Sequence, residues 1–304
     1  MPQGRITIVD AMQPHLVLGN IVEENVAQTP ELGVIPVRVL ESGIRYNTLA
    51  MVELPTTGFR KLGEGMPASK GRYEPREHKC FLFGGRVEVE RAAAAADAGG
   101  MSAIEARATR GVMLSALATL GPQIFYGTDR GADGFQGLKA FTPFGGAYTK
   151  NATGTTASTA TSVFGVKLGE DYAELIAGQG NVFDLGEFRD QDILGTNNKP
   201  LPGRVADLEG WIGLQLNHKA SAVRVCNITA DVGKGCTDKL LGDALDLLPV
   251  GAEPDYWFMN KRSRNQLRLS RSTPENVYPD MPTESNGIPI ICTDSILNTD
   301  AIEV

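Results

Sequence analysis

The chain has 304 residues, of which 42% are hydrophobic and 21% charged, so it carries enough apolar material for a folded core. Its net charge of -7 argues against a general nucleic-acid coat, because binding phosphates needs clustered lysine and arginine. Four scattered cysteines without a CxxC pair, together with only three histidines, argue against a disulfide framework and a structural zinc site.

No apolar stretch reaches the roughly 20 residues that span a bilayer, and the N-terminus lacks a cleavable signal pattern. We therefore expect a soluble protein without a membrane partner. The first predicted elements are an amphipathic helix over residues 10–27, which ends before Pro30, and a strand over residues 34–41. In that strand Arg38 lies on the face opposite two valines.

The stretch from Tyr46 to Glu90 predicts a long hairpin. Residues 46–54 and 80–90 are strand-like, and the segment between them is rich in glycine and proline. A two-stranded ribbon of this length cannot build its own core, so it must lie on something. Composition alone favours a ribbon folded back on its own domain. The charged residues of its basic-biased tip, residues 58–79, include Arg60, Lys61, Glu64, Lys70, Arg72 and Arg76.

A short helix is predicted over Ala92–Ala96 and a long one over residues 101–120. Ser102 and Glu105 have the spacing of a capping box, which would open the long helix. We expect it to end at Gly121-Pro122. At about 1.5 Å per residue it would form a rod of about 30 Å.

The second half of the chain mixes short strands and helices. Residues 151–162 are polar and of low complexity, which is typical of a loop, and a hairpin connection over residues 217–221 is predicted to join two strands. Thr237 is the expected cap of an apolar helix, and a basic helix follows at residues 261–269. Strands are expected at 163–168, 211–216, 222–228, 256–259 and 288–292. Without a regular βαβ period, this order indicates an α+β fold.

No segment carries a recognised catalytic pattern. The Gly-Lys pair at residues 232–236 is not a phosphate-binding loop, because Ile228 stands where that loop needs glycine. His218 is interpreted as a solvated turn residue, and the basic series at 261–271 as a solvated helix face or a salt-bridged subunit contact. The acids Asp184, Glu187, Asp190 and Asp192 are assigned to a solvated loop. We expect no enzymatic activity, no cofactor and no metal site.

Several segments, in order along the chain, resemble the major capsid proteins of tailed bacteriophages with the Hong Kong 97-like fold. The similarity is greatest to the podovirus epsilon-fifteen-like group. It rests on residues 54–62, 125–127, 135–138, 213–216, 222–228, 257–260, 264–268, 287–290 and 297–301. Residues 139–162 and 178–200 carry no clear resemblance.

The resemblance implies five parts. They are an N-terminal arm (1–35), an extended E-loop (36–92), a peripheral domain with a long spine helix and a projecting loop (93–228), an axial domain (229–285) and a C-terminal strand returning to the core (286–304). The predicted hairpin would then lie across a neighbouring subunit. The implied inter-subunit contact residues at the E-loop tip are Arg60, Lys61, Glu64, Lys70, Arg72 and Arg76.

The implied function is self-assembly into the pentamers and hexamers of an icosahedral phage head. The shell would enclose double-stranded DNA without sequence-specific contacts, and further partners would be scaffold, portal and cement proteins. Assembly would take place in the host cytoplasm, and the product would be part of the virion. Some relatives crosslink their shells through a lysine, but Lys61 and Lys70 have no evident partner, so no crosslink is expected.

Two alternatives remain at this stage. An encapsulin-like shell would package a cargo protein instead of DNA, and the N-terminal arm followed by a full-length hairpin argues against it. An enzyme with an unrecognised site would require a deep pocket that holds paired titratable groups.

Overall fold

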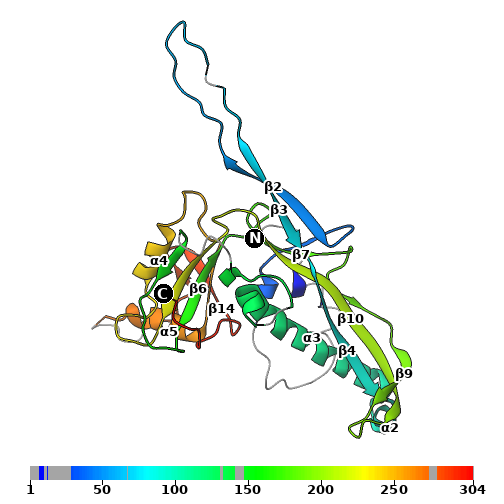
Figure 1. Cartoon of the computed structure of the whole chain (residues 1–304). Helices are drawn as coiled ribbons and strands as arrows, with labels where there is room; N and C mark the ends of the chain where they lie inside the picture. Colours follow the sequence, from blue (N-terminus) through cyan, green and yellow to red (C-terminus); the bar gives the residue numbers. More distant parts are fainter. Residues whose placement is uncertain are drawn as a thin grey trace.

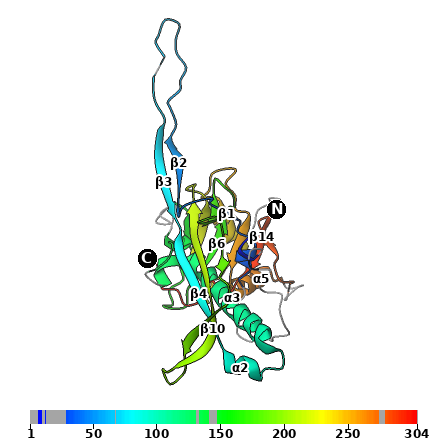
Figure 2. The same cartoon turned by 90° about the vertical axis from the view of Figure 1, so that its right-hand side faces the viewer.

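The α+β class expected from the sequence is confirmed: two six-stranded sheets and the helices form a body, from which a two-stranded ribbon projects (Figures 1 and 2). The predicted helix over residues 10–27 falls almost entirely outside the residues that the structure describes. The computed structural model describes residues 7–9, 12, 29–66, 68–130, 133–140, 147–273 and 279–303.

The first sheet is organised around one long strand, β10 (Pro200–Leu216). Strand β4 (Phe81–Glu90) pairs along one side of it. Along the other side lie, in succession, β9 (Arg189–Leu194), β8 (Asp184–Leu185) and β7 (Ala173–Ala177), and β1 (Val37–Val39) adds to β7. The loop predicted around Asp184 and Asp190 is therefore wrong. Their backbones pair with β10, which extends far enough to offer them an edge.

The second sheet has the strand order β13, β14, β12, β6, β11, β5. The bounds of these strands are Glu284–Ser285, Ile288–Cys292, Tyr256–Met259, Thr161–Val166, Ala222–Ile228 and Thr149–Asn151. The predicted hairpin across residues 217–221 is wrong, because β10 and β11 belong to different sheets. All seven residues of β11 are buried, so this strand needs neighbours on both sides, and β6 and β5 supply them.

Helix α2 (Arg91–Ala96) agrees with prediction, but α3 (Gly100–Tyr126) runs past its predicted end. Pro122 lies within α3, and the last turn buries Ile124, Phe125 and Tyr126. The free energy gained by burying three large side chains offsets the loss of the backbone hydrogen bond that proline removes. The predicted capping box is also wrong. Glu105 instead accepts a hydrogen bond from Arg204, and the cap residue Gly99 has no side chain to contribute.

Phe125, at the end of α3, joins the two sheets. Its ring centroid lies 5.3 Å from that of Phe164 in β6 and 5.8 Å from that of Phe258 in β12. The same core cluster includes Leu175 of β7 and Ile212 of β10. One hydrophobic core therefore holds both sheets against α3. Short 3-10 turns flank it at Pro30–Gly33, Gly127–Arg130 and Leu138–Ala140.

Two capped helices cover the second sheet. The predicted cap is confirmed: Thr237 accepts a hydrogen bond from the Leu240 amide at 3.1 Å, at the start of α4 (Asp238–Leu245). Helix α5 (Lys261–Ser270) starts at Asn260. Within the basic series at 261–271, the predicted solvated face fits the exposed Lys261, whereas other members contact the chain itself; the predicted subunit contact stays a prediction. Arg262 donates to the Thr159 carbonyl at 2.7 Å, and Arg271 pairs with Asp238.

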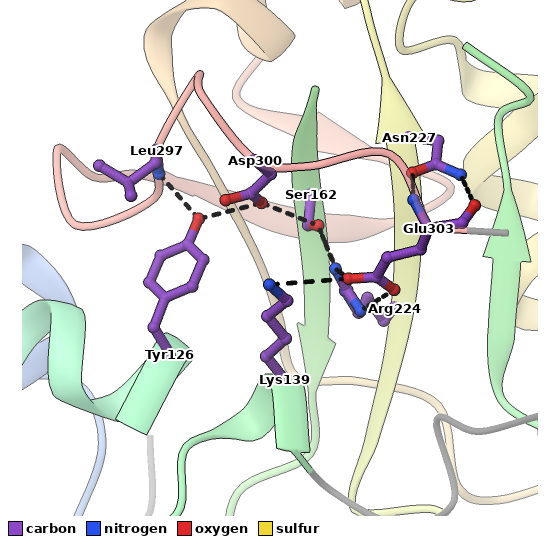
Figure 3. Close-up of polar contacts among 8 residues, drawn as sticks. All are labelled: Tyr126, Lys139, Ser162, Arg224, Asn227, Leu297, Asp300 and Glu303. Carbon is purple, nitrogen blue, oxygen red and sulfur yellow. Dashed lines mark hydrogen bonds and ion pairs between the residues drawn. The ribbon is translucent and has the colours of Figure 1, made fainter. Parts of the chain in front are cut away.

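A buried polar network fixes the C-terminal segment on the second sheet (Figure 3). Arg224 of β11 donates to both carboxylate oxygens of Glu303, at 2.7 and 2.8 Å, and to the hydroxyl of Ser162 in β6. Tyr126, the last residue of α3, accepts a hydrogen bond from the Leu297 amide at 2.9 Å. The chain end is thus tied to β6, β11 and α3 at once.

Candidate inter-subunit interface

The projecting ribbon consists of β2 (Arg45–Glu53) and β3 (Arg72–Lys79), paired antiparallel. The predicted strand at residues 80–90 is confirmed as β4, but its predicted pairing in the hairpin is wrong, because β4 pairs with β10 in the first sheet. The physical reason is side-chain character. In β4 the buried Val87 and Val89 need a core, whereas the largely charged β3 can remain in solvent.

One face of the ribbon carries apolar side chains that the chain itself does not cover. Leu49 pairs with Pro75 and Met51 pairs with Tyr73, so these four residues lie side by side on one face. Leu49, Met51 and Tyr73 are exposed. The opposite face includes Tyr46, Thr48 and Ala50 and borders a hollow of about 580 Å³ above the body.

The ribbon tip, residues 54–71, adds four more apolar side chains: Leu54, Phe59, Leu62 and Met66. Among the described residues, fifteen large hydrophobic side chains are exposed, and seven of them belong to the ribbon. A short segment that concentrates half of the exposed apolar groups has the character of an interface rather than an ordinary surface.

The charged residues predicted as contacts divide into two groups. In the tip, Arg60 donates to the Glu64 carbonyl at 2.6 Å, and the Lys61 amide donates to the Glu64 carboxylate at 3.1 Å. Lys70 lies on the returning side of the tip and is exposed.

Strand β3 carries the other two predicted contact residues. Arg72, at its start, pairs with Glu74 at 3.1 Å and with Glu53 at 3.5 Å. Arg76 is placed differently from its prediction. It lies near the base of the ribbon, where it donates to the backbone carbonyl of Asn217.

Asn217, which sequence reasoning did not single out, clamps the ribbon to the body. Its side-chain oxygen accepts from the Thr48 hydroxyl at 2.8 Å, and Nε2 of His78 lies 2.8 Å from the same oxygen. Its side-chain nitrogen donates to the Glu170 carbonyl at 2.7 Å. The only sequence signal was its position in a polar connection between two strands.

Nearby charge and burial also influence the ionisable side chains at the ribbon base. Burial lowers the pKa of His78, the Arg76 charge lowers it further, and the hydrogen bond with Asn217 opposes both effects. Nearby, Arg38 pairs with the buried carboxylate of Glu174 at 2.5 Å and donates to the Tyr46 hydroxyl at 3.1 Å. These side-chain contacts therefore fix the direction in which the ribbon leaves the body.

Two solved phage capsid subunits share this architecture over nearly the whole chain. The structure of bacteriophage Epsilon15 aligns with a TM-score of 0.66 and 18% identity, covering 99% of this chain and 98% of that chain. The bacteriophage JBD30 capsid aligns with a TM-score of 0.52 and 9% identity, covering 95% and 99%. An encapsulin from Synechococcus elongatus aligns less closely, with a TM-score of 0.49, 8% identity and coverage of 74% and 96%.

The fold is therefore the Hong Kong 97-like fold of phage capsid subunits, as the resemblance indicated. The family model of major capsid protein GP7 matches residues 17–303, so the chain belongs to that family. Its predicted role as the shell-building subunit of a phage head is confirmed, and its location is the virion capsid. A comparison with curated proteins finds no match. Within the described residues, no helix is long and apolar enough to cross a membrane.

Proposed function

We propose that copies of the chain associate through the ribbon into pentamers and hexamers, which close into an icosahedral shell around double-stranded DNA. The observation that carries this proposal is the ribbon that projects from its own body (Figure 1) and exposes seven large apolar side chains. An isolated two-stranded ribbon is marginal in water, so a neighbouring subunit is the natural partner for its seven exposed apolar side chains.

The free energy of burying apolar side chains is large enough to support assembly. Burying one large apolar side chain contributes about 1.5–3 kcal/mol, and part of that gain is offset by ordering the tip and by loss of subunit motion. Obligate interfaces bury about 2,000–5,000 Å² each. In a ring, the ribbon of every subunit would contact the next subunit. The same modest contact is thus repeated around the ring, and together these contacts would stabilise a closed shell.

The six predicted contact residues have different proposed roles. Arg60, Lys61, Glu64 and Lys70 would set the register of the tip on a neighbour, since exposed charges contribute specificity more than affinity. Arg72 would do so lower on the ribbon. Arg76 would act on the clamp at Asn217, to which it already donates.

The remaining family-derived assignments are part of the same proposal. The arm, E-loop, peripheral domain, axial domain and returning strand would be residues 1–35, 36–92, 93–228, 229–285 and 286–304. Assembly would occur in the host cytoplasm with scaffold, portal and cement proteins. The net charge of -7 suits a shell that encloses DNA without binding it tightly. None of these steps requires catalysis by the subunit.

The test shortens the ribbon and preserves its base. Ser69 contacts both the amide and the carbonyl of Thr56, so the two sides of the tip meet there. Replacing residues 57–68 by Asn-Gly would close the ribbon with a tight turn. We expect a subunit with unchanged circular dichroism that no longer forms shells in negative-stain micrographs. Normal shells from this variant would overturn the proposal.

A further inference from the structure

Strand β4 has an unprotected edge. It pairs with β10 along one side, and within the described residues no strand pairs with its other side. Its first five residues, Phe81 to Gly85, contain neither a charge nor a proline, and Leu82 is 60% exposed. An apolar edge of this kind attracts other strands, so folded proteins usually cover it or interrupt it with charge.

A hollow adjoins the start of β4. It has a volume of about 260 Å³ and lies between the start of β4 and the second half of α3. Phe81, Leu82, Phe83 and Leu120 line it, and the exposed Asp133 contributes its one carboxylate. A second hollow of about 460 Å³ shares the side chain of Phe81 and extends towards the ribbon base. Together they form a groove, here called the β4 groove, that is largely apolar between β4 and α3, with Asp133 as the acid there, and polar towards the ribbon base, where Glu77, His78 and Lys79 line it.

The ribbon tip has the complementary chemistry. Phe59 and Leu62 are 112% and 105% exposed, so neither side chain is covered by its own chain. Residues 54–71 contain three cations (Arg60, Lys61 and Lys70) and one anion (Glu64), a net charge of +2. Arg60 is used inside the tip, where it donates to the Glu64 carbonyl. Lys61 is therefore the cation between the two apolar groups that best suits Asp133.

A tip cannot reach the β4 groove of its own subunit. Lys79, at the ribbon base, lies 17 positions after Leu62. An extended chain rises about 3.3 Å per residue, so the tip stands roughly 55 Å from the ribbon base. Figure 2 shows the ribbon pointing away from β4 and α3. A ribbon tip that fills this groove therefore belongs to a second copy of the chain.

We infer that the β4 groove receives the ribbon tip of a neighbouring subunit, with Phe59 and Leu62 in the hollow and Lys61 beside Asp133. This inference rests on the proposed function and adds the receiving surface to it. Two apolar side chains would fill the groove, and the ion pair would fix which way the tip lies.

Disulfide trapping tests the placement. In the variant Leu62→Cys/Leu82→Cys, mild oxidation of assembled shells should link subunits into a ladder on a non-reducing gel. The matched control is Leu62→Cys/Leu194→Cys, because Leu194 is 68% exposed but lies on β9, across β10 from β4. Three of the native thiols, Cys80, Cys226 and Cys236, are buried. Cys292 is partly exposed, so both double variants carry Cys292→Ser, and each single-cysteine variant gives the background. An equal or stronger ladder in the control, or none in the test pair, would overturn the assignment.

A charge swap tests the contact independently. Asp133→Lys and Lys61→Glu should each raise the protein concentration needed for shell formation about tenfold, and the combination should restore it. Failure of the double variant to recover would overturn the pairing. If unaltered protein forms shells but the 62–82 link is missing, only the groove assignment fails. If unaltered protein forms neither rings nor shells, the proposed function fails as well.

Discussion

The Arg224–Glu303 pair offers the sharpest test of how the chain end is held. The Arg224 side chain is 4% exposed and that of Glu303 is 37% exposed, so the two partners face different consequences when separated. In the Glu303→Gln variant a buried guanidinium loses its carboxylate. In the Arg224→Met variant the buried charge itself is gone, and Glu303 can turn to water.

The expected costs follow from this asymmetry. Removing one partner of a buried ion pair costs about 3–5 kcal/mol, and the partial exposure of Glu303 reduces the figure for Glu303→Gln to about 2 kcal/mol. Replacing the buried arginine by a hydrophobic side chain of similar length should cost only about 1 kcal/mol. The double variant should cost about the same as Arg224→Met, because the stranded charge is absent.

Urea denaturation of the unassembled subunit, followed by circular dichroism, measures all three free energies of unfolding. The control is Lys261→Met, which breaks a 3.4 Å pair with Asp294 at a lysine that is 78% exposed and should change stability by less than about 0.5 kcal/mol. The reasoning is refuted if Arg224→Met is at least as costly as Glu303→Gln. An additive double variant, at about 3 kcal/mol, would refute it equally.

Two further results are expected. Because the pKa of His78 lies below its ordinary value, the neutral ring stabilises the clamp above about pH 6.5, and this stability is lost as pH falls towards the lowered pKa. Amide exchange in β2 and β3, corrected for intrinsic rates, should therefore become faster as the pH falls from 7.5 to 5.5. The increase should be smaller in the His78→Gln variant, and an equal increase in the variant and the unaltered protein would contradict the assignment. Gly121→Ala should cost about 1–3 kcal/mol, since its methyl group would lie 2.6 Å from the Glu31 carboxylate. In the same denaturation assay, Gly111→Ala should instead stabilise the subunit by about 0.5–1 kcal/mol, because its methyl group would point into open space on the same helix. If both substitutions change the free energy of unfolding in the same direction, the close packing around Gly121 does not explain the result.

Local signals in the sequence predicted local structure well. The cap at Thr237, the strand β12 and the helix α2 each depend on a few adjacent residues, and each was found where expected. The end of α3 was missed because its last turn is held by burial against both sheets, which outweighs the Gly121-Pro122 stop signal.

Strand partners could not be read from the sequence. Strand β4 has the alternation of a hairpin strand, yet it pairs with β10 about 120 residues later. There Val87 and Val89 join a core formed with β10, α2 and α3. The candidate site shows the same limit. Arg60 and Lys61 lie at the tip as predicted, whereas Asn217 was missed, because a distant polar residue becomes a clamp only after the chain has folded.

The connection over residues 217–221 has a mechanical consequence. It passes from the first sheet to the second and also carries Asn217, so a small rotation between the sheets would be transmitted directly to the ribbon base. With a tip roughly 55 Å away, the ribbon is a lever: a turn of about 5° at the base would move the tip by about 5 Å. A single sequence could thereby aim the same arm at neighbours that stand at slightly different angles, as the proposed pentamers and hexamers would require.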